Sequence, residues 1–138
     1  GKFGAAGLFL VAGDQGLLQH RAAWTNHGDT WGIPGGARDK PETAVDAALR
    51  ETTEETGIAA ADVDVLDSMV TAGPFDGGWT YTTVLARTVS GQCLDTTANE
   101  ESTELRWVAF SDVDALNLLG PFRSALPAVL ARWEELNS

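Results

Sequence analysis

The amino-acid sequence predicts a single α/β domain in which a mixed β-sheet packs against two main helices. Short apolar runs of strand length alternate with turn residues along much of the chain. Two longer segments, Pro41–Thr56 and Pro121–Leu136, carry apolar residues at helical spacing. The 138 residues, 43% of them hydrophobic, suffice for one core without disulfides or metal staples. We therefore expect residues 1–138 to form one domain.

The first elements along the chain are expected to form a β-hairpin. Ala5–Ala12 is a short apolar run with β-branched and aromatic members, and Gly13–Gly16 has the composition of a turn. Leu17–Ala22 then follows as a second strand. The glycine-rich stretch Trp24–Lys40 is expected to be a loop around a short extended segment at Trp31–Ile33.

The remainder of the chain is expected to supply both helices and three more strands. Pro41–Thr56 is predicted to be a helix because proline suits a first helical position and Gly57 suits the position after a helix. The closing helix is Pro121–Leu136, where Trp133 belongs to the apolar stripe. The three strands are Val63–Ala72, Thr80–Val89 and Leu105–Phe110.

Charge and composition exclude several classes of partner. Twenty acidic residues against nine Lys and Arg give a net charge of -11, whereas proteins that bind DNA or RNA present a basic surface. No apolar run approaches the roughly 18 residues of a membrane span. The single cysteine, Cys93, rules out an intramolecular disulfide framework. We expect no nucleic-acid polymer, no membrane and a cytoplasmic location.

Three glutamates stand out on the helix expected at residues 41–56. Glu51, Glu54 and Glu55 share a sector about 100° wide, away from the stripe that can pack on a sheet. Like charges at this spacing repel one another, and the dipole disfavours acids near a helix C-terminus. One interpretation is a solvated acidic face. The unfavourable placement favours a second one, a site for Mg²⁺ or Mn²⁺.

The segment around these glutamates resembles the Nudix box. The fixed positions of that motif are matched by Gly36, Glu42, Arg50, Glu51, Glu54, Glu55 and Gly57. The preceding stretch Trp31–Gly36 is also similar to the family. One departure is Thr52, where the family prefers an apolar residue. Thr52 lies on the packing stripe, so it concerns local packing and leaves the catalytic set intact.

The resemblance implies a fold, a reaction and a cofactor. The fold is an α/β/α sandwich with a loop–helix–loop catalytic box. The reaction is hydrolysis of a nucleoside diphosphate linked to another moiety, by attack of water on phosphorus. It depends on Mg²⁺ or Mn²⁺, and the carbonyl of Gly35 often joins the three helix glutamates as a ligand.

The box positions also carry individual roles by the same resemblance. Glu51 is a candidate general base, Glu54 belongs to the catalytic set, and Arg50 orients the carboxylates. Gly36, Glu42 and Gly57 match structural positions of the box.

An acidic run before the strand expected at residues 105–110 offers a further metal ligand. Relatives commonly bring one more glutamate from a loop before a late strand. The candidates here are Glu101, which we favour, Glu100, and Glu104, which could equally be a strand-edge residue facing water.

Residues that bind the rest of the substrate are less sharply indicated. Arg21 follows the second strand, where some relatives contact a phosphate or base, although a surface arginine is the alternative. Phe75 and Trp79 flank a glycine-rich loop and could stack on a nucleobase or belong to the core.

The resemblance implies a small-molecule nucleotide as substrate. Nucleoside triphosphates, oxidised nucleotides and ADP-ribose-like compounds are the possibilities. The assembly would be a monomer or homodimer. The alternative function is a nucleotide-binding or regulatory module without turnover.

Overall fold

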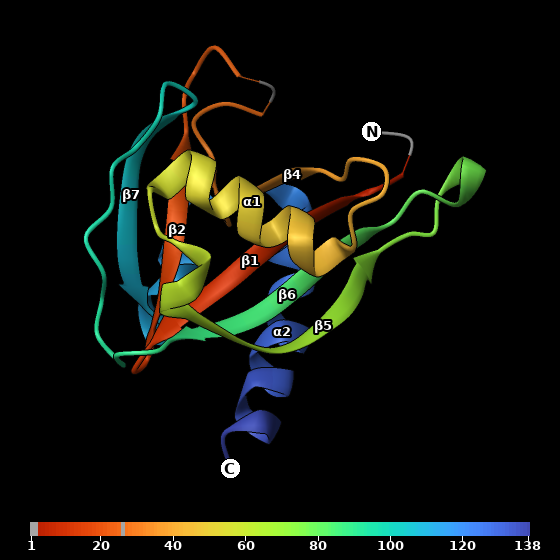
Figure 1. Cartoon of the computed structure of the whole chain (residues 1–138). Coiled ribbons are helices and arrows are strands. Elements are labelled where there is room, and N and C mark those ends of the chain that lie inside the picture. Colours follow the sequence, from red (N-terminus) through yellow and green to blue (C-terminus); the bar gives the residue numbers. More distant parts are fainter. Residues whose placement is uncertain (1–2, 26) are drawn as a thin grey trace.

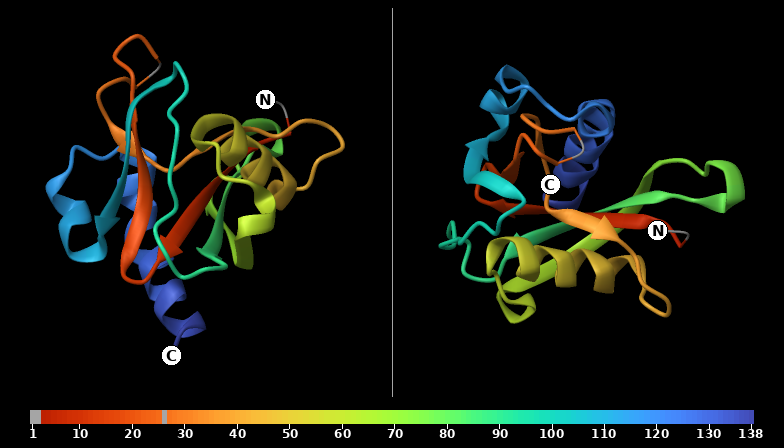
Figure 2. Two further views of the ribbon diagram at one scale, coloured as in Figure 1. Left: turned by 60° about the vertical axis from the view of Figure 1, so that its left-hand side comes forward. Right: turned by 90° about the horizontal axis from the view of Figure 1, so that it is seen from above.

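The computed structural model describes residues 3–25 and 27–138 and has three layers. A twisted sheet forms the middle layer, and the helices α1 (Ala44–Thr56) and α2 (Gly120–Leu136) lie on its opposite faces, as Figure 1 and the right-hand view of Figure 2 show. The α/β/α sandwich expected from the sequence is confirmed.

The described residues contribute seven strands to one mixed sheet. The main path runs β3-β2-β1-β6-β5, with β4 added to β1 and β7 added to β2. Strands β1 and β6 are parallel, whereas the other pairs are antiparallel. The strands are β1 (Ala5–Ala12), β2 (Gln15–Arg21), β3 (Trp31–Gly32), β4 (Gly35–Ala37), β5 (Val63–Ala72), β6 (Tyr81–Thr88) and β7 (Ser102–Ala109).

Most elements match the sequence expectation, and the differences have local causes. Gly35–Ala37 is a strand inside the predicted loop because its pairing with β1 overrides the low strand propensity of glycine. Strand β7 begins at Ser102, three residues before the expected Leu105, because Ser102 pairs with Arg21 beyond an irregularity in β2. Three short 3₁₀ helices, not anticipated from the sequence, are Ala60–Asp62, Asp76–Gly78 and Phe110–Ala115.

Helix α1 begins at Ala44, so the expectation that it starts at Pro41 is wrong. Thr43 is the N-cap, and its hydroxyl accepts a hydrogen bond from the Asp46 N–H at 3.1 Å. The helix ends as expected, because Gly57 adopts a left-handed conformation with φ 80° and its N–H donates to the Thr53 carbonyl.

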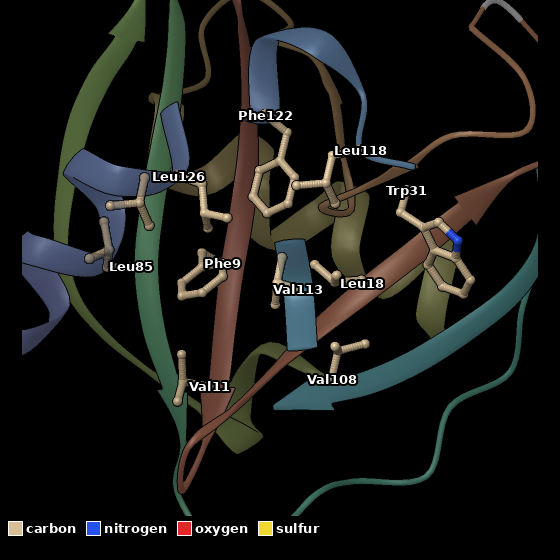
Figure 3. Close-up of a cluster of buried hydrophobic side chains, with 11 residues drawn as sticks. Phe9, Val11, Leu18, Trp31, Leu85, Val108, Val113, Leu118, Phe122 and Leu126 are labelled. Carbon is tan, nitrogen blue, oxygen red and sulfur yellow. The ribbon is translucent and has the colours of Figure 1, made fainter. Parts of the chain in front are cut away.

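The two helices present side chains of different size to the sheet. Large apolar residues of the sheet, including Phe9 and Leu85, meet those of α2, including Leu126, on one face (Figure 3). On the other face, α1 presents the small residues Ala47 and Ala48. Small side chains allow a helix to lie close to the strands beneath it.

Three tryptophans lie in the core or against it: Trp31 is buried, and Trp107 and Trp133 pack on the two core clusters. Within residues 3–25 and 27–138, helices long and apolar enough to cross a membrane are absent.

Candidate functional site

Helix α1 and the loop before β7 enclose a polar cavity of about 470 Å³. We call it the carboxylate cavity. The sequence-predicted residues Glu51, Glu54 and Glu55 line one side, and Glu100 and Glu101 line the other together with Asn99. The structure therefore brings helix and loop glutamates together around one space.

Glu104 lies apart from the carboxylate cavity. It is exposed on β7, where its carboxylate accepts a hydrogen bond of 2.8 Å from Arg106. Of the three glutamates considered from the sequence as a further ligand, this one does not line the carboxylate cavity.

Glu55 is the buried member of the carboxylate group, with 3% of its surface exposed. The side chain of Gln19 in β2 donates a hydrogen bond of 2.8 Å to Glu55 Oε1. Burial, reinforced by the adjacent Glu51 carboxyl, raises the pKa of Glu55 to about 8, while the bond from Gln19 opposes the rise. Glu55 Oε2 is buried and has no hydrogen-bond partner among the described residues.

Gln19 and Asn99 were not anticipated as site residues from the sequence. Gln19 also donates to the Ser102 hydroxyl at 2.6 Å, so it joins α1 to the start of β7. An amide directly after the two leucines of β2 is the signal that could have found it, since a buried amide needs partners. For Asn99 the only signal in the sequence is its position immediately before Glu100 and Glu101.

Arg50 connects α1 to the loop that precedes it. Its guanidinium binds both carboxylate oxygens of Glu42, at 2.7 and 2.9 Å, and donates to Glu51 Oε1 at 2.9 Å. A longer contact of 3.4 Å reaches Glu54. The bidentate pair holds the pKa of Glu42 at about 2, well below its usual value, and raises the pKa of Arg50. Arg50 thus fixes the orientation of Glu51.

Glycines in β4 allow the chain to pass close beneath the helix glutamates. A Cβ atom on Gly36 would lie 2.6 Å from the carboxyl carbon of Glu51, so a larger residue would push that carboxylate aside. Gly35 pairs with Gly7 of β1 and is not part of the lining of the carboxylate cavity.

The carboxylate cavity fits a hard divalent cation by its donor chemistry. In the described part of the chain, three or more His, Cys, Asp or Glu groups do not converge as a ready ligand set. Glu54, Glu100 and Glu101 are exposed and are therefore free to turn inward by side-chain rotation. The unpaired Glu55 Oε2 supplies a fixed oxygen, and oxygen-rich sets suit Mg²⁺ or Mn²⁺.

A second cavity of about 220 Å³ lies between the sheet and α2. We call it the apolar cavity, because the lining contains no charged side chain. Phe75 and Trp79, the predicted stacking residues, stand on its rim with ring centroids 5.8 Å apart. The lining residues are Ile33, Thr71, Ala72, Phe75, Trp79, Tyr81, Thr83, Leu119, Pro121, Phe122 and Ala125.

Arg21, the third residue considered for substrate binding, belongs to the end of β2 rather than to the apolar cavity. The next residue, Ala22, donates its N–H to the carbonyl of Glu101 at 2.9 Å. This hydrogen bond joins the end of β2 to the loop that lines the carboxylate cavity, and Arg21 is the residue immediately before Ala22.

Comparison with known proteins identifies the class to which this fold and box belong. The family model of the NUDIX domain matches residues 1–132, and the chain belongs to the Nudix hydrolase family. Members of this family generally use divalent metal ions.

Two mycobacterial proteins are similar over almost the whole chain. A Mycobacterium tuberculosis protein, provisionally named 8-oxo-dGTP diphosphatase 3, is 46% identical over 146 residues, which cover 100% of this chain and 63% of that protein. The chain therefore spans less than two thirds of that relative. The crystal structure of RenU, a Nudix hydrolase from M. smegmatis, is 42% identical with a TM-score of 0.87, covering 95% of this chain and 87% of the other.

A more distant structure, an Ap4A hydrolase from C. elegans, shares the fold. It is 22% identical, with a TM-score of 0.72 over 95% of this chain and 98% of the other.

Proposed function

We propose that this chain is a divalent-metal-dependent pyrophosphohydrolase that cleaves a nucleoside diphosphate linked to another moiety. The observation that carries the proposal is the carboxylate cavity, where Glu51, Glu54 and Glu55 of the Nudix box face Glu100 and Glu101. Phosphate oxygens alone would be repelled by such a surface on a chain with a net charge of -11. Mg²⁺ or Mn²⁺ held by these carboxylates would neutralise the phosphates and lower the pKa of a bound water.

The protein groups then have separable tasks. A glutamate, for which Glu51 is our first choice, removes a proton from the attacking water, whose oxygen bonds to phosphorus. The bond between phosphorus and the bridging oxygen breaks, and that oxygen leaves on the product phosphate. Glu54, Glu55 and Glu101 serve as metal ligands, and the Gly35 carbonyl remains a candidate for a further ligand.

Arg50 is best described as a positioning residue in this mechanism. Its donors are already occupied by Glu42, Glu51 and the Ala37 carbonyl, so it acts through the carboxylates and not on substrate. Arg21 is proposed to contact a substrate phosphate.

The proposed substrate is a nucleoside triphosphate or an oxidised form of one. The name of the 46% identical mycobacterial relative supports this choice. The apolar cavity offers a place where the base stacks on Phe75 and Trp79. ADP-ribose and dinucleoside polyphosphates are the competing substrates.

The test is release of phosphate and pyrophosphate from a panel of nucleotides with Mg²⁺, with Mn²⁺ and with a chelator. The panel contains nucleoside triphosphates, 8-oxo-dGTP, ADP-ribose and a dinucleoside tetraphosphate. We expect metal-dependent hydrolysis that a Glu54→Gln, Glu55→Gln double variant abolishes. Glu134→Gln is the matched control, because Glu134 is exposed on α2 and distant in function from the box.

Hydrolysis that persists with chelator, or in the double variant, would contradict the metal-dependent mechanism. A folded protein that binds nucleotides but releases no product with either metal would favour the alternative, a binding module without turnover.

A further inference from the structure

Gln19 connects the two walls of the carboxylate cavity, although it does not line the cavity itself. Its side-chain nitrogen donates one hydrogen bond to Glu55 Oε1 of α1, at 2.8 Å, and one to the Ser102 hydroxyl of β7, at 2.6 Å. All three residues are buried. Because an amide nitrogen has two protons, both of these donors are occupied inside the protein and neither is left for a substrate.

An irregularity in the pairing of β2 with β7 places Ser102 within reach of Gln19. Arg21, two residues after Gln19, is opposite Ser102 rather than Thr103, because β7 contains one extra residue at this point. Side chains alternate between the faces of a strand, so regular pairing would set Thr103 on the same face as Gln19. The extra residue brings Ser102 to that face instead, where its hydroxyl accepts from Gln19.

Ser102 is itself held by the loop that carries the opposing glutamates. Its N–H donates to the carbonyl of Asn99 at 3.3 Å, and Asn99 Oδ1 accepts a hydrogen bond of 3.0 Å from the N–H of Glu101. Gln19 is therefore anchored on a segment whose backbone is already fixed by hydrogen bonds.

The hydrogen bond from Gln19 determines which oxygen of Glu55 remains for a ligand. The terminal torsion of a glutamate is broad, so a carboxylate that nothing holds can turn. Gln19 holds Oε1, and Oε2 is left buried with no hydrogen-bond partner among the described residues. The carboxyl of Glu51 is adjacent, and two ionised carboxylates cannot donate to each other. A cation is the partner that would satisfy both.

We propose that Gln19 is a positioning residue that holds Glu55 in the orientation in which it binds the divalent metal. This inference rests on the proposed function, because it requires a metal ion at the carboxylate cavity. Gln19 acts through Glu55 and not on the substrate, and Ser102 keeps the amide of Gln19 in place. Residues that orient metal ligands in this way typically contribute roughly 10–100-fold to metal affinity.

The affinity of Gln19→Met for Mn²⁺ tests the assignment, measured from the electron paramagnetic resonance of the free ion. Methionine is similar in length to glutamine but has no N–H to donate. We expect the dissociation constant for Mn²⁺ to rise about 10–100-fold. Gln92→Met is the matched control, because Gln92 is exposed and outside the cavity lining, and it should bind Mn²⁺ as wild type does. A folded Gln19→Met protein with wild-type affinity would overturn the proposal.

Ser102→Ala is a second variant, which removes the anchor of Gln19 but leaves its bond to Glu55. We expect the dissociation constant for Mn²⁺ to rise about twofold to fivefold, since the amide is then held at one end only. A role confined to joining α1 to β7 would instead lower the melting temperature of both variants and leave their Mn²⁺ affinity unchanged. Unchanged affinity in Ser102→Ala would overturn the anchoring role, and the whole proposal if Gln19→Met does not fold.

Failure of this inference is distinguishable from failure of the proposed function. If wild type binds no Mn²⁺, the proposed function is wrong and this inference falls with it. If wild type and Gln19→Met bind Mn²⁺ equally, the inference alone is wrong. In an active enzyme, the Mn²⁺ concentration for half-maximal hydrolysis should rise by the same factor as the dissociation constant. A loss of rate in Gln19→Met that added Mn²⁺ does not restore would contradict a role through the metal site.

Discussion

The two faces of the sheet differ in what their residues contribute: stability on the α2 face and the proposed active site on the α1 face. The face under α2 is packed by large side chains such as Phe9, Phe122 and Leu126, which make a stable core. On the face under α1, leucines of the sheet meet the alanines of the helix, and the helix carries a buried, partly unsatisfied glutamate. Favourable packing on one face therefore offsets the cost of concentrating carboxylates on the other, as expected where function opposes stability.

The largest effect is expected on the α1 face, from a change that removes charge but not volume. Glu55→Gln should lower kcat/KM by about 10²–10⁴-fold, because it removes a proposed metal ligand at the centre of the carboxylate cavity. The melting temperature should not fall, since a buried ionisable group is replaced by a neutral one. Activity assays and a thermal scan measure both, with Glu134→Gln as control. A folded variant with wild-type activity would contradict the proposed role of the α1 face in catalysis.

On the α2 face the opposite pattern is expected. Leu126→Ala removes a side chain that is 4% exposed and should lower the free energy of unfolding by about 2–5 kcal/mol. Because Leu126 is not among the residues that line either cavity, kcat at 20 °C should stay close to wild type. Urea unfolding and initial rates provide the comparison. A stable variant with reduced kcat would show that the two faces are not separable.

Thr52 allows the comparison of stability and function to be made within α1, because it is a packing residue on the helix that carries the box glutamates. It is 2% exposed, and its hydroxyl is buried without a hydrogen-bond partner among the described residues. Thr52→Val should therefore raise the free energy of unfolding by about 1 kcal/mol, because valine fills the same space without a polar group. Chemical unfolding of the two proteins measures the gain. A loss of stability would mean that the hydroxyl has a partner in solution.

The smallest effect is expected at Glu42, which supports the site from outside the carboxylate cavity. Its pKa falls from 4.5 to about 2 on folding, because Arg50 binds its carboxylate. The associated stability is present above pH 4.5 and is lost as the pH falls toward 2. Glu42→Gln should therefore flatten the decline in melting temperature across that window. An identical decline in both proteins would show that Arg50 does not stabilise the Glu42 carboxylate.

The sequence predicts the architecture well where a pattern is local. The apolar runs and the helical spacing located β1, β5, α1 and α2, and Gly57 marked the end of α1 correctly. The start of α1 was misplaced because proline and threonine both suit a helix N-terminus, and only the hydrogen bond from Asp46 selects Thr43.

The site was predictable only in part for a similar reason. The box glutamates share one helix, so their spacing alone places them together. Gln19 and Ser102 are 83 residues apart, and their meeting depends on the pairing of β2 with β7. The contact between Tyr81 and Gly7 likewise depends on the parallel pairing of β1 with β6. Such contacts are properties of the topology and leave no local signal.

The most direct test of the central claim is a titration of the protein with Mn²⁺, followed by the electron paramagnetic resonance of the free ion. The account predicts saturable binding by wild type and by Glu134→Gln, and its loss in the Glu54→Gln, Glu55→Gln double variant. Equal binding of Mn²⁺ by all three proteins would contradict the assignment of the carboxylate cavity as the metal site.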